Sequence, residues 1–90
     1  MIRVLIVDDS LATRSAVSRA LSREMDIEVL RPVGSGSIAL ERIMKEAPDV
    51  VVLDVDMPGI GGLEVQVRGE HRLPGSAFAL CHAGLRSPDL

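Results

Sequence analysis

Two short apolar runs, each ending on a carboxylate, constrain the fold of this chain more than any other feature. Residues 4–7 run into Asp8 and Asp9, and residues 50–53 run into Asp54. Neither run alternates with polar residues, which is typical of strands buried on both faces of a parallel sheet. The sequence therefore predicts an α/β protein whose chain crosses the same sheet repeatedly in one direction.

The segments between these runs complete an alternating pattern. Residues 11–25 and about 37–47 carry apolar side chains at helical spacing, and residues 27–33 indicate a strand. Pro32 cannot donate to a strand ladder, so this strand suits an edge position. The order βαβαβ with right-handed crossovers predicts a flavodoxin-like parallel sheet in the order 2-1-3.

The pattern weakens beyond residue 67. Residues 68–76 indicate a loop, and residues 77–81 could add a short fourth strand. We therefore divide the chain into residues 1–65, the N-terminal part of an incomplete domain, and residues 66–90, a divergent tail. Without a fourth strand, the third strand would expose an apolar edge, and such an edge favours a homodimer.

Composition excludes several classes of partner. The 90 residues include 13 acidic and 10 basic side chains and a single aromatic residue, so we expect no direct contact with nucleic acid. No run of about 20 apolar residues is present, and the charged start is no signal peptide, so we expect no membrane segment. The only cysteine, Cys81, fits the reducing cytoplasm.

The three carboxylates at the strand ends suggest a site. If the strands that end at Val7 and Leu53 are neighbours, Asp8, Asp9 and Asp54 converge at one sheet edge, where they would repel one another. Carboxylate oxygens that leave room for water and phosphate suit Mg²⁺, and a metal-neutralised carboxylate can act as a nucleophile toward a phosphoryl group. The competing interpretation is that these residues only cap a helix and a turn. A pair and a third carboxylate at two adjacent strand ends favour the site.

Two motifs carry a family resemblance. Residues 7–10 (Val-Asp-Asp-Ser) and residues 54–58 (Asp-Val-Asp-Met-Pro), followed by Gly62, resemble the response regulator receiver family. The resemblance covers roughly residues 2–65, and the wording of the motifs is similar to the receiver domain of chemotaxis methylesterases.

The resemblance implies a role for each acidic residue. Asp54 would be the phosphoacceptor in two-component phosphorelay signalling, with a phosphohistidine on a sensor histidine kinase as the donor. Mg²⁺ would be bound by Asp9 directly, by Asp8 through water, by Asp54, and by the backbone carbonyl of Asp56. Met57, Pro58 and Gly62 would shape the loop that follows.

The sequence departs from the family further along. Receivers carry a Ser or Thr after a fourth strand, where this chain has Cys81 or His82, and a Lys after a fifth strand, which has no counterpart here. One hypothesis is a gene truncated or frame-shifted near residues 65–68, whose product could be a non-functional fragment. Another is a pseudo-receiver, a protein-binding module that is not phosphorylated.

Other functions are less well supported. Gly34, Gly36 and Ala39 spell a dinucleotide-binding fingerprint after a strand, but that reading leaves Asp8 and Asp9 unexplained.

Enzymatic and zinc-binding functions also lack a motif. His71, Cys81 and His82 lack the paired spacing of a zinc site. A methylesterase's catalytic domain would need far more chain, so we predict no enzymatic hydrolysis.

Overall fold

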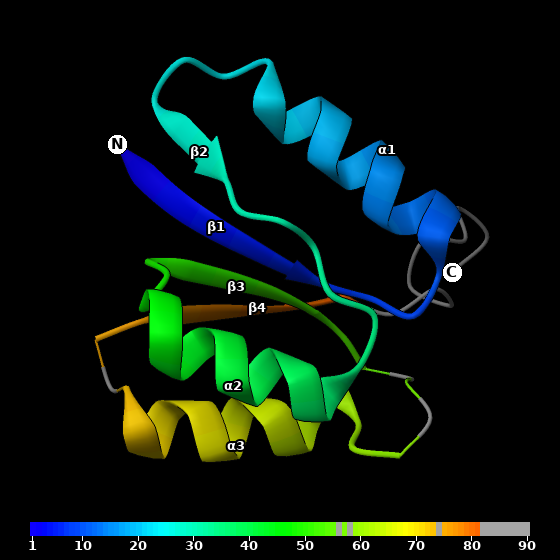
Figure 1. The fold of residues 1–90 in the computed structure, drawn as a ribbon, viewed down its shortest axis with the longest axis vertical. Coiled ribbons are helices and arrows are strands. Elements are labelled where there is room, and N and C mark those ends of the chain that lie inside the picture. The colour runs from blue at the N-terminus through cyan, green and yellow to red at the C-terminus, as the bar shows by residue number, and fades with distance from the viewer. Residues whose placement is uncertain (56, 58, 74, 82–90) are drawn as a thin grey trace, which may run out of the picture.

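Strands and helices alternate along the chain in the computed structural model, which describes residues 1–55, 57, 59–73 and 75–81 (Figure 1). The strands are β1 (Ile2–Val7), β2 (Ile27–Val29), β3 (Val50–Asp54) and β4 (Ala77–Cys81). The helices are α1 (Leu11–Ser22), α2 (Gly36–Glu46) and α3 (Gly62–Arg72).

The strands form one parallel sheet in the order β2-β1-β3-β4. The predicted order 2-1-3 is thus confirmed, and the fourth strand does form. It pairs with β3 from Val50↔Ala77 to Asp54↔Cys81. The edge of β3 is therefore covered, and β4 becomes an edge strand of the described sheet.

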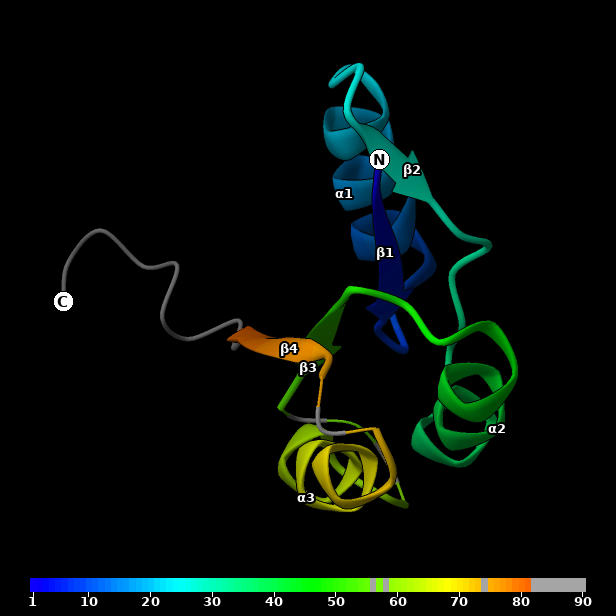
Figure 2. The same ribbon diagram turned by 90° about the vertical axis from the view of Figure 1, so that its left-hand side faces the viewer.

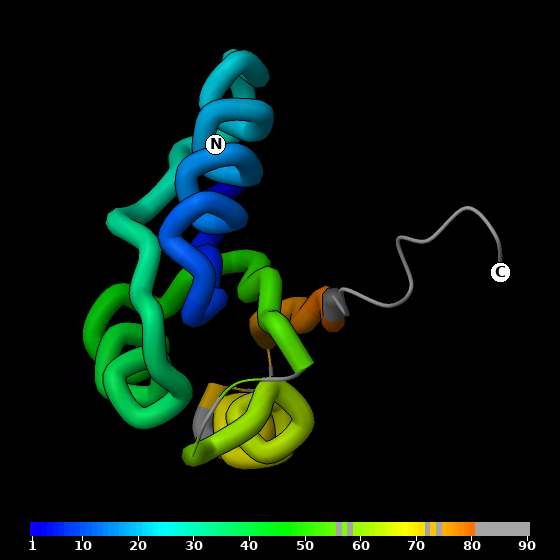
Figure 3. Tube along the Cα trace, turned by 90° about the vertical axis from the view of Figure 1, so that its right-hand side faces the viewer, coloured from blue at the N-terminus to red at the C-terminus, as the bar shows by residue number. Residues whose placement is uncertain are grey.

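The helices lie on both faces of the sheet. α1 packs on β1 and β2, whereas α2 and α3 pack together on the other side (Figures 1 and 2). α1 and α3 lie at opposite ends of the long axis, as the Cα trace also shows (Figure 3). Within the described residues, no helix combines the length and the apolar character that a membrane crossing requires.

The core lies between the sheet and the α2–α3 layer. Leu5 and Val7 of β1 and Val51 and Leu53 of β3 are fully buried there, because alternate residues of a strand face the same side. Burying each such side chain contributes about 1.5–3 kcal/mol, so this layer is the main source of stability. The helices and the loops beside them add further residues to the core: Leu30, Val33, Ala39, Leu40, Ile43, Met57 and Val65.

The predicted loop at residues 68–76 is wrong for its first five residues, because α3 continues to Arg72. The reason is tertiary packing. Val65 is fully buried, and Gly69 lies against the Phe78 ring of β4. A local pattern that contains a glycine and few apolar residues does not reveal those contacts.

Two predicted elements are shorter than expected. The first helix ends at Ser22, and Met25, the last residue of the predicted helix, is 93% exposed. The second strand ends at Val29, well before Pro32.

Candidate functional site

The pairing of β1 with β3 brings two acidic strand ends together. Val7 pairs with Leu53 in parallel register, so Asp8 and Asp54 leave adjacent strands at the same edge of the sheet. The chain from β1 crosses to β2 on one side, and the chain from β3 continues to β4 on the other. Ligands of doubly wound sheets bind at such a point, where the strand order reverses.

Asp8 is the buried member of the acidic group, with 7% of its surface exposed. Its backbone N–H donates to the carbonyl of Val33 (3.1 Å), and its Oδ1 accepts a hydrogen bond from the backbone N–H of Ser10 (2.9 Å). A buried carboxylate is costly unless it is hydrogen-bonded, and these bonds hold Asp8 in one orientation.

Asp9 is exposed and follows directly. The N-cap of α1 is Ser10, whose Oγ accepts a hydrogen bond from the Thr13 N–H (3.2 Å). The helix therefore does not need the Asp9 carboxylate as its cap, which removes the main alternative explanation for this residue.

Asp54 is half-buried at the end of β3, and the chain after it returns closely past its backbone. The N–H of Gly62 donates to the carbonyl of Val55 (3.3 Å). A Cβ added at Gly62 would lie 2.8 Å from the carbonyl carbon of Asp54, so only glycine fits at this position. Met57 is buried in the core and anchors the same loop. This packing agrees with the loop-shaping role predicted for Met57 and Gly62.

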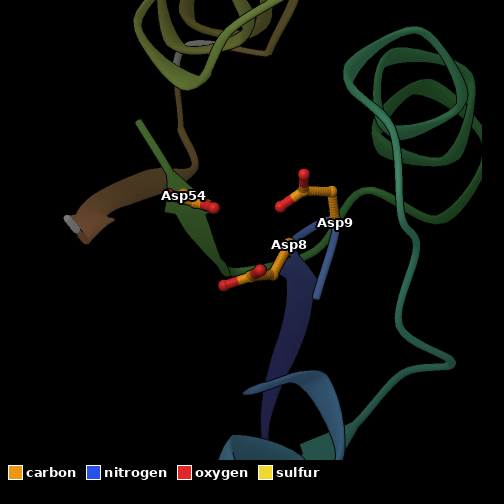
Figure 4. Close-up of side chains that lie close together, drawn as sticks. All are labelled: Asp8, Asp9 and Asp54. Atoms are coloured by element: carbon orange, nitrogen blue, oxygen red, sulfur yellow. The ribbon is translucent and has the colours of Figure 1, made fainter. Parts of the chain in front are cut away.

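The carboxylates of Asp8, Asp9 and Asp54 gather around one small volume (Figure 4). One oxygen from each lies within 4.8 Å of the others. Hard oxygen donors of this kind suit Mg²⁺, which takes one or two carboxylates and keeps water or phosphate in its remaining positions. The donor set therefore fits the predicted ion.

Some predicted site residues cannot be placed in the same way. Asp56, Pro58 and His82 lie outside the described residues. Cys81, the last residue of β4, pairs in parallel register with Asp54.

The two alternative ligand sites gain no support. His71 lies exposed on α3, and the three aspartates are the group of potential metal ligands found among the described residues. The glycine turn of the dinucleotide fingerprint follows the edge strand β2, not a central strand. Gly36 is buried against the carbonyl of Ile60, so its small size serves packing.

One residue near the site was not recognised from the sequence. This residue is Arg14, a charged residue within the helix predicted over residues 11–25. In the structure its Nη1 donates to the backbone carbonyl of Asp8 (2.7 Å). Its spacing of six residues from Asp8, one turn into α1, is the only signal that could have suggested this contact.

A comparison with protein families agrees with this arrangement. Two acidic residues follow β1 and a third ends β3, in a flavodoxin-like sheet. A family model described as response regulator receiver domain matches residues 4–72. The chain belongs to the response regulator receiver family. The family match continues beyond residue 65, through the end of α3.

Individual relatives of this receiver are consistent with that assignment. A protein-glutamate methylesterase/protein-glutamine glutaminase from Geobacter metallireducens is 39% identical over 75 residues, which are 81% of this chain and 21% of the relative. The chain thus spans about a fifth of the length of that curated relative. The resemblance to methylesterase receivers is confirmed, and it concerns the receiver part alone.

Solved structures share the fold. The response regulator domain of Thermotoga maritima CheB has a TM-score of 0.84 and 25% identity, covering 98% of this chain and 65% of that one. The response regulator TrrA, solved in complex with the histidine kinase ThkA, has a TM-score of 0.83 and 32% identity, covering 92% and 70%.

Proposed function

We propose that this receiver accepts a phosphoryl group on Asp54 from a phosphohistidine of a sensor histidine kinase, with Mg²⁺ bound at Asp8, Asp9 and Asp54. The observation that carries the proposal is the convergence of three carboxylates from two adjacent strand ends, with oxygens within 4.8 Å of one another. A family match over residues 4–72 supports the same activity.

The chemistry assigns Asp54 as the nucleophile. An oxygen of its carboxylate attacks phosphorus in line, the new O–P bond forms, and the P–N bond to the donor imidazole breaks. The imidazole leaves with the bonding electron pair and takes up a proton. Asp8 is less suited to attack, because it is buried and its carboxylate holds the Ser10 N–H.

The other aspartates neutralise charge. A bound Mg²⁺ would screen the attacking carboxylate and the transferring phosphate from each other. The proposed ligands are Asp9 directly, Asp8 through water, Asp54, and the backbone carbonyl of Asp56. The role of Asp56 rests on the family resemblance alone.

A solved complex supports the proposed donor. TrrA was solved with its histidine kinase, which supports a kinase as the partner of this receiver. We place the protein in the cytoplasm and expect no enzymatic activity of its own beyond phosphoryl uptake, and no direct contact with nucleic acid or membrane.

A pseudo-receiver is the second candidate. The observation that favours it is the residue in register with Asp54 on β4, which is Cys81 where the family has a Ser or Thr nearby. Such a protein would keep the fold and signal through protein contacts without phosphorylation.

Intact mass spectrometry tests the two functions. The full chain would be incubated with Mg²⁺ and a small-molecule phosphodonor, alongside Asp54→Asn and the control Asp26→Asn, which removes an exposed carboxylate before β2. Gain of one phosphoryl group by the wild type and Asp26→Asn, but not by Asp54→Asn, is the expected result. No gain by a chain that circular dichroism shows to be folded would favour the pseudo-receiver.

A further inference from the structure

The backbone of Asp8 is held on both sides of its Cα. On one side the Asp8 N–H donates to the Val33 carbonyl (3.1 Å), and on the other the Asp8 carbonyl accepts from Nη1 of Arg14 (2.7 Å). Because the peptide group is planar, holding the Asp8 carbonyl also sets the direction in which Asp9 leaves the strand. Arg14 therefore acts on the positions of both carboxylates without touching either carboxylate.

Arg14 reaches this carbonyl through space left by Gly34. A Cβ added at Gly34 would lie 2.6 Å from Nη1 of Arg14, 3.4 Å from its Cζ and 3.8 Å from the Asp8 carbonyl oxygen. Gly34 is exposed and its φ is not in the left-handed region, so backbone conformation does not require glycine there. The missing side chain makes room for the guanidinium.

Arg14 donates its hydrogen bond to a backbone carbonyl and not to a carboxylate. Among the ion pairs of the described residues, none joins Arg14 to Asp8 or Asp9. A guanidinium that paired with these carboxylates would compete with a cation for them, whereas one that holds the backbone leaves their oxygens available.

We propose that Arg14 is a positioning residue for the metal site, which it preorganises by fixing the Asp8–Asp9 peptide in the space opened by Gly34. The inference rests on the proposed function. Ligands held in place before the ion arrives lose less freedom on binding, and residues that orient metal ligands typically change metal affinity by about 10- to 100-fold.

An effect of charge alone and an effect of positioning change the cation affinity in opposite directions. Removing a positive charge beside a cation site strengthens cation binding by Coulomb's law. Loss of positioning weakens it. Arg14→Ala therefore separates the two effects by direction, and Gly34→Ala displaces the guanidinium while keeping every charge.

The experiment measures the affinity of the full chain for Mn²⁺, which serves as the probe. The electron paramagnetic resonance signal of the free ion reports how much Mn²⁺ is unbound. The variants are Arg14→Ala and Gly34→Ala, with the matched controls Arg19→Ala, an exposed arginine of the same helix, and Gly75→Ala, where an added Cβ meets nothing within 4 Å. We expect about tenfold weaker binding in both test variants and unchanged binding in both controls.

Two further readouts separate positioning from a general loss of structure. Thermal unfolding without metal should place Gly34→Ala close to the wild type, because the added methyl group meets only the end of a flexible side chain. Phosphoryl uptake by Gly34→Ala should be slow at limiting Mg²⁺ and return to the wild-type rate at saturating Mg²⁺.

The outcomes are distinguishable. Unchanged or tighter Mn²⁺ binding by Arg14→Ala and Gly34→Ala, with the wild type binding normally, overturns the inference alone. A folded wild type that binds no Mn²⁺, or an Asp54→Asn variant that binds it equally well, overturns the proposed metal site and this inference with it.

Discussion

The Asp8 carboxylate accepts a hydrogen bond from the backbone N–H of Ser10 over 2.9 Å, while the Ser10 side chain caps α1 through the Thr13 N–H. The end of β1, the acidic site and the start of the first helix are therefore one connected unit. The two functions of Ser10 use different atoms, so a substitution can separate them.

Ser10→Ala should lower the free energy of unfolding by about 1 kcal/mol, because the N-cap hydroxyl is lost while the backbone N–H remains. Phosphorylation of Asp54 should be retained. Urea unfolding and intact mass measure the two quantities. Ser35→Ala, which removes the equivalent cap of α2 from the Ile38 N–H, is the matched control for stability. Loss of phosphorylation without loss of stability would show that the hydroxyl acts in the site.

Gly62→Ala should both destabilise the protein and impair phosphorylation. An added Cβ would collide with the Asp54 carbonyl group and approach the Cα of Val55 to 3.0 Å, and these are backbone atoms that cannot move away cheaply. Overpacking of this kind costs about 1–3 kcal/mol. Chemical denaturation and the rate of phosphoryl uptake test the prediction against Gly75→Ala. Wild-type behaviour of Gly62→Ala would mean that the loop after β3 lies elsewhere in solution.

Stability should fall in acid partly through Glu46. The side-chain hydrogen bond from Arg42 lowers the pKa of Glu46 below its ordinary value of 4.5, against a smaller opposing effect of burial. The folded state then binds protons less readily than the unfolded state, so this contribution is complete above about pH 4.5 and is lost as the pH falls through the lower folded pKa.

Glu46→Gln should accordingly reduce the difference between the unfolding free energies measured near neutral pH and in acid. An i,i+4 pair contributes about 0.5 kcal/mol, which sets the expected size. Glu41→Gln, an exposed glutamate of the same helix, makes the same charge change without this partner. An equal effect of both variants would assign the acid sensitivity to net charge instead.

The outer edge of β4 should support self-association. Among the described residues no strand pairs with that edge, and Leu80 beside it is 39% exposed. Light scattering after size exclusion should show a dimer fraction that grows with concentration. Leu80→Lys should abolish it, because charge on an edge strand opposes pairing, whereas Val67→Lys on α3 should not. A monomer at all concentrations would contradict the prediction.

The local sequence was sufficient for the elements that carry strong patterns. Two apolar runs without polar alternation predicted β1 and β3. Their terminal carboxylates predicted the acidic cluster, because parallel strands joined by helices end at one edge of the sheet. Asp8, Asp9 and Asp54 could be selected on this ground alone, before any resemblance was considered.

Only the tertiary structure decided the features that depend on contacts between distant residues. α3 continues past Gly69 because it packs against Phe78, which no local periodicity reports. β4 can pair in parallel with β3 only because α3 carries the chain back to the end of the sheet where β3 begins. Arg14 reaches the Asp8 carbonyl through the space beside Gly34, and these residues lie 20 positions apart in sequence. The contact forms only when α1 and the turn between β2 and α2 meet beside Asp8.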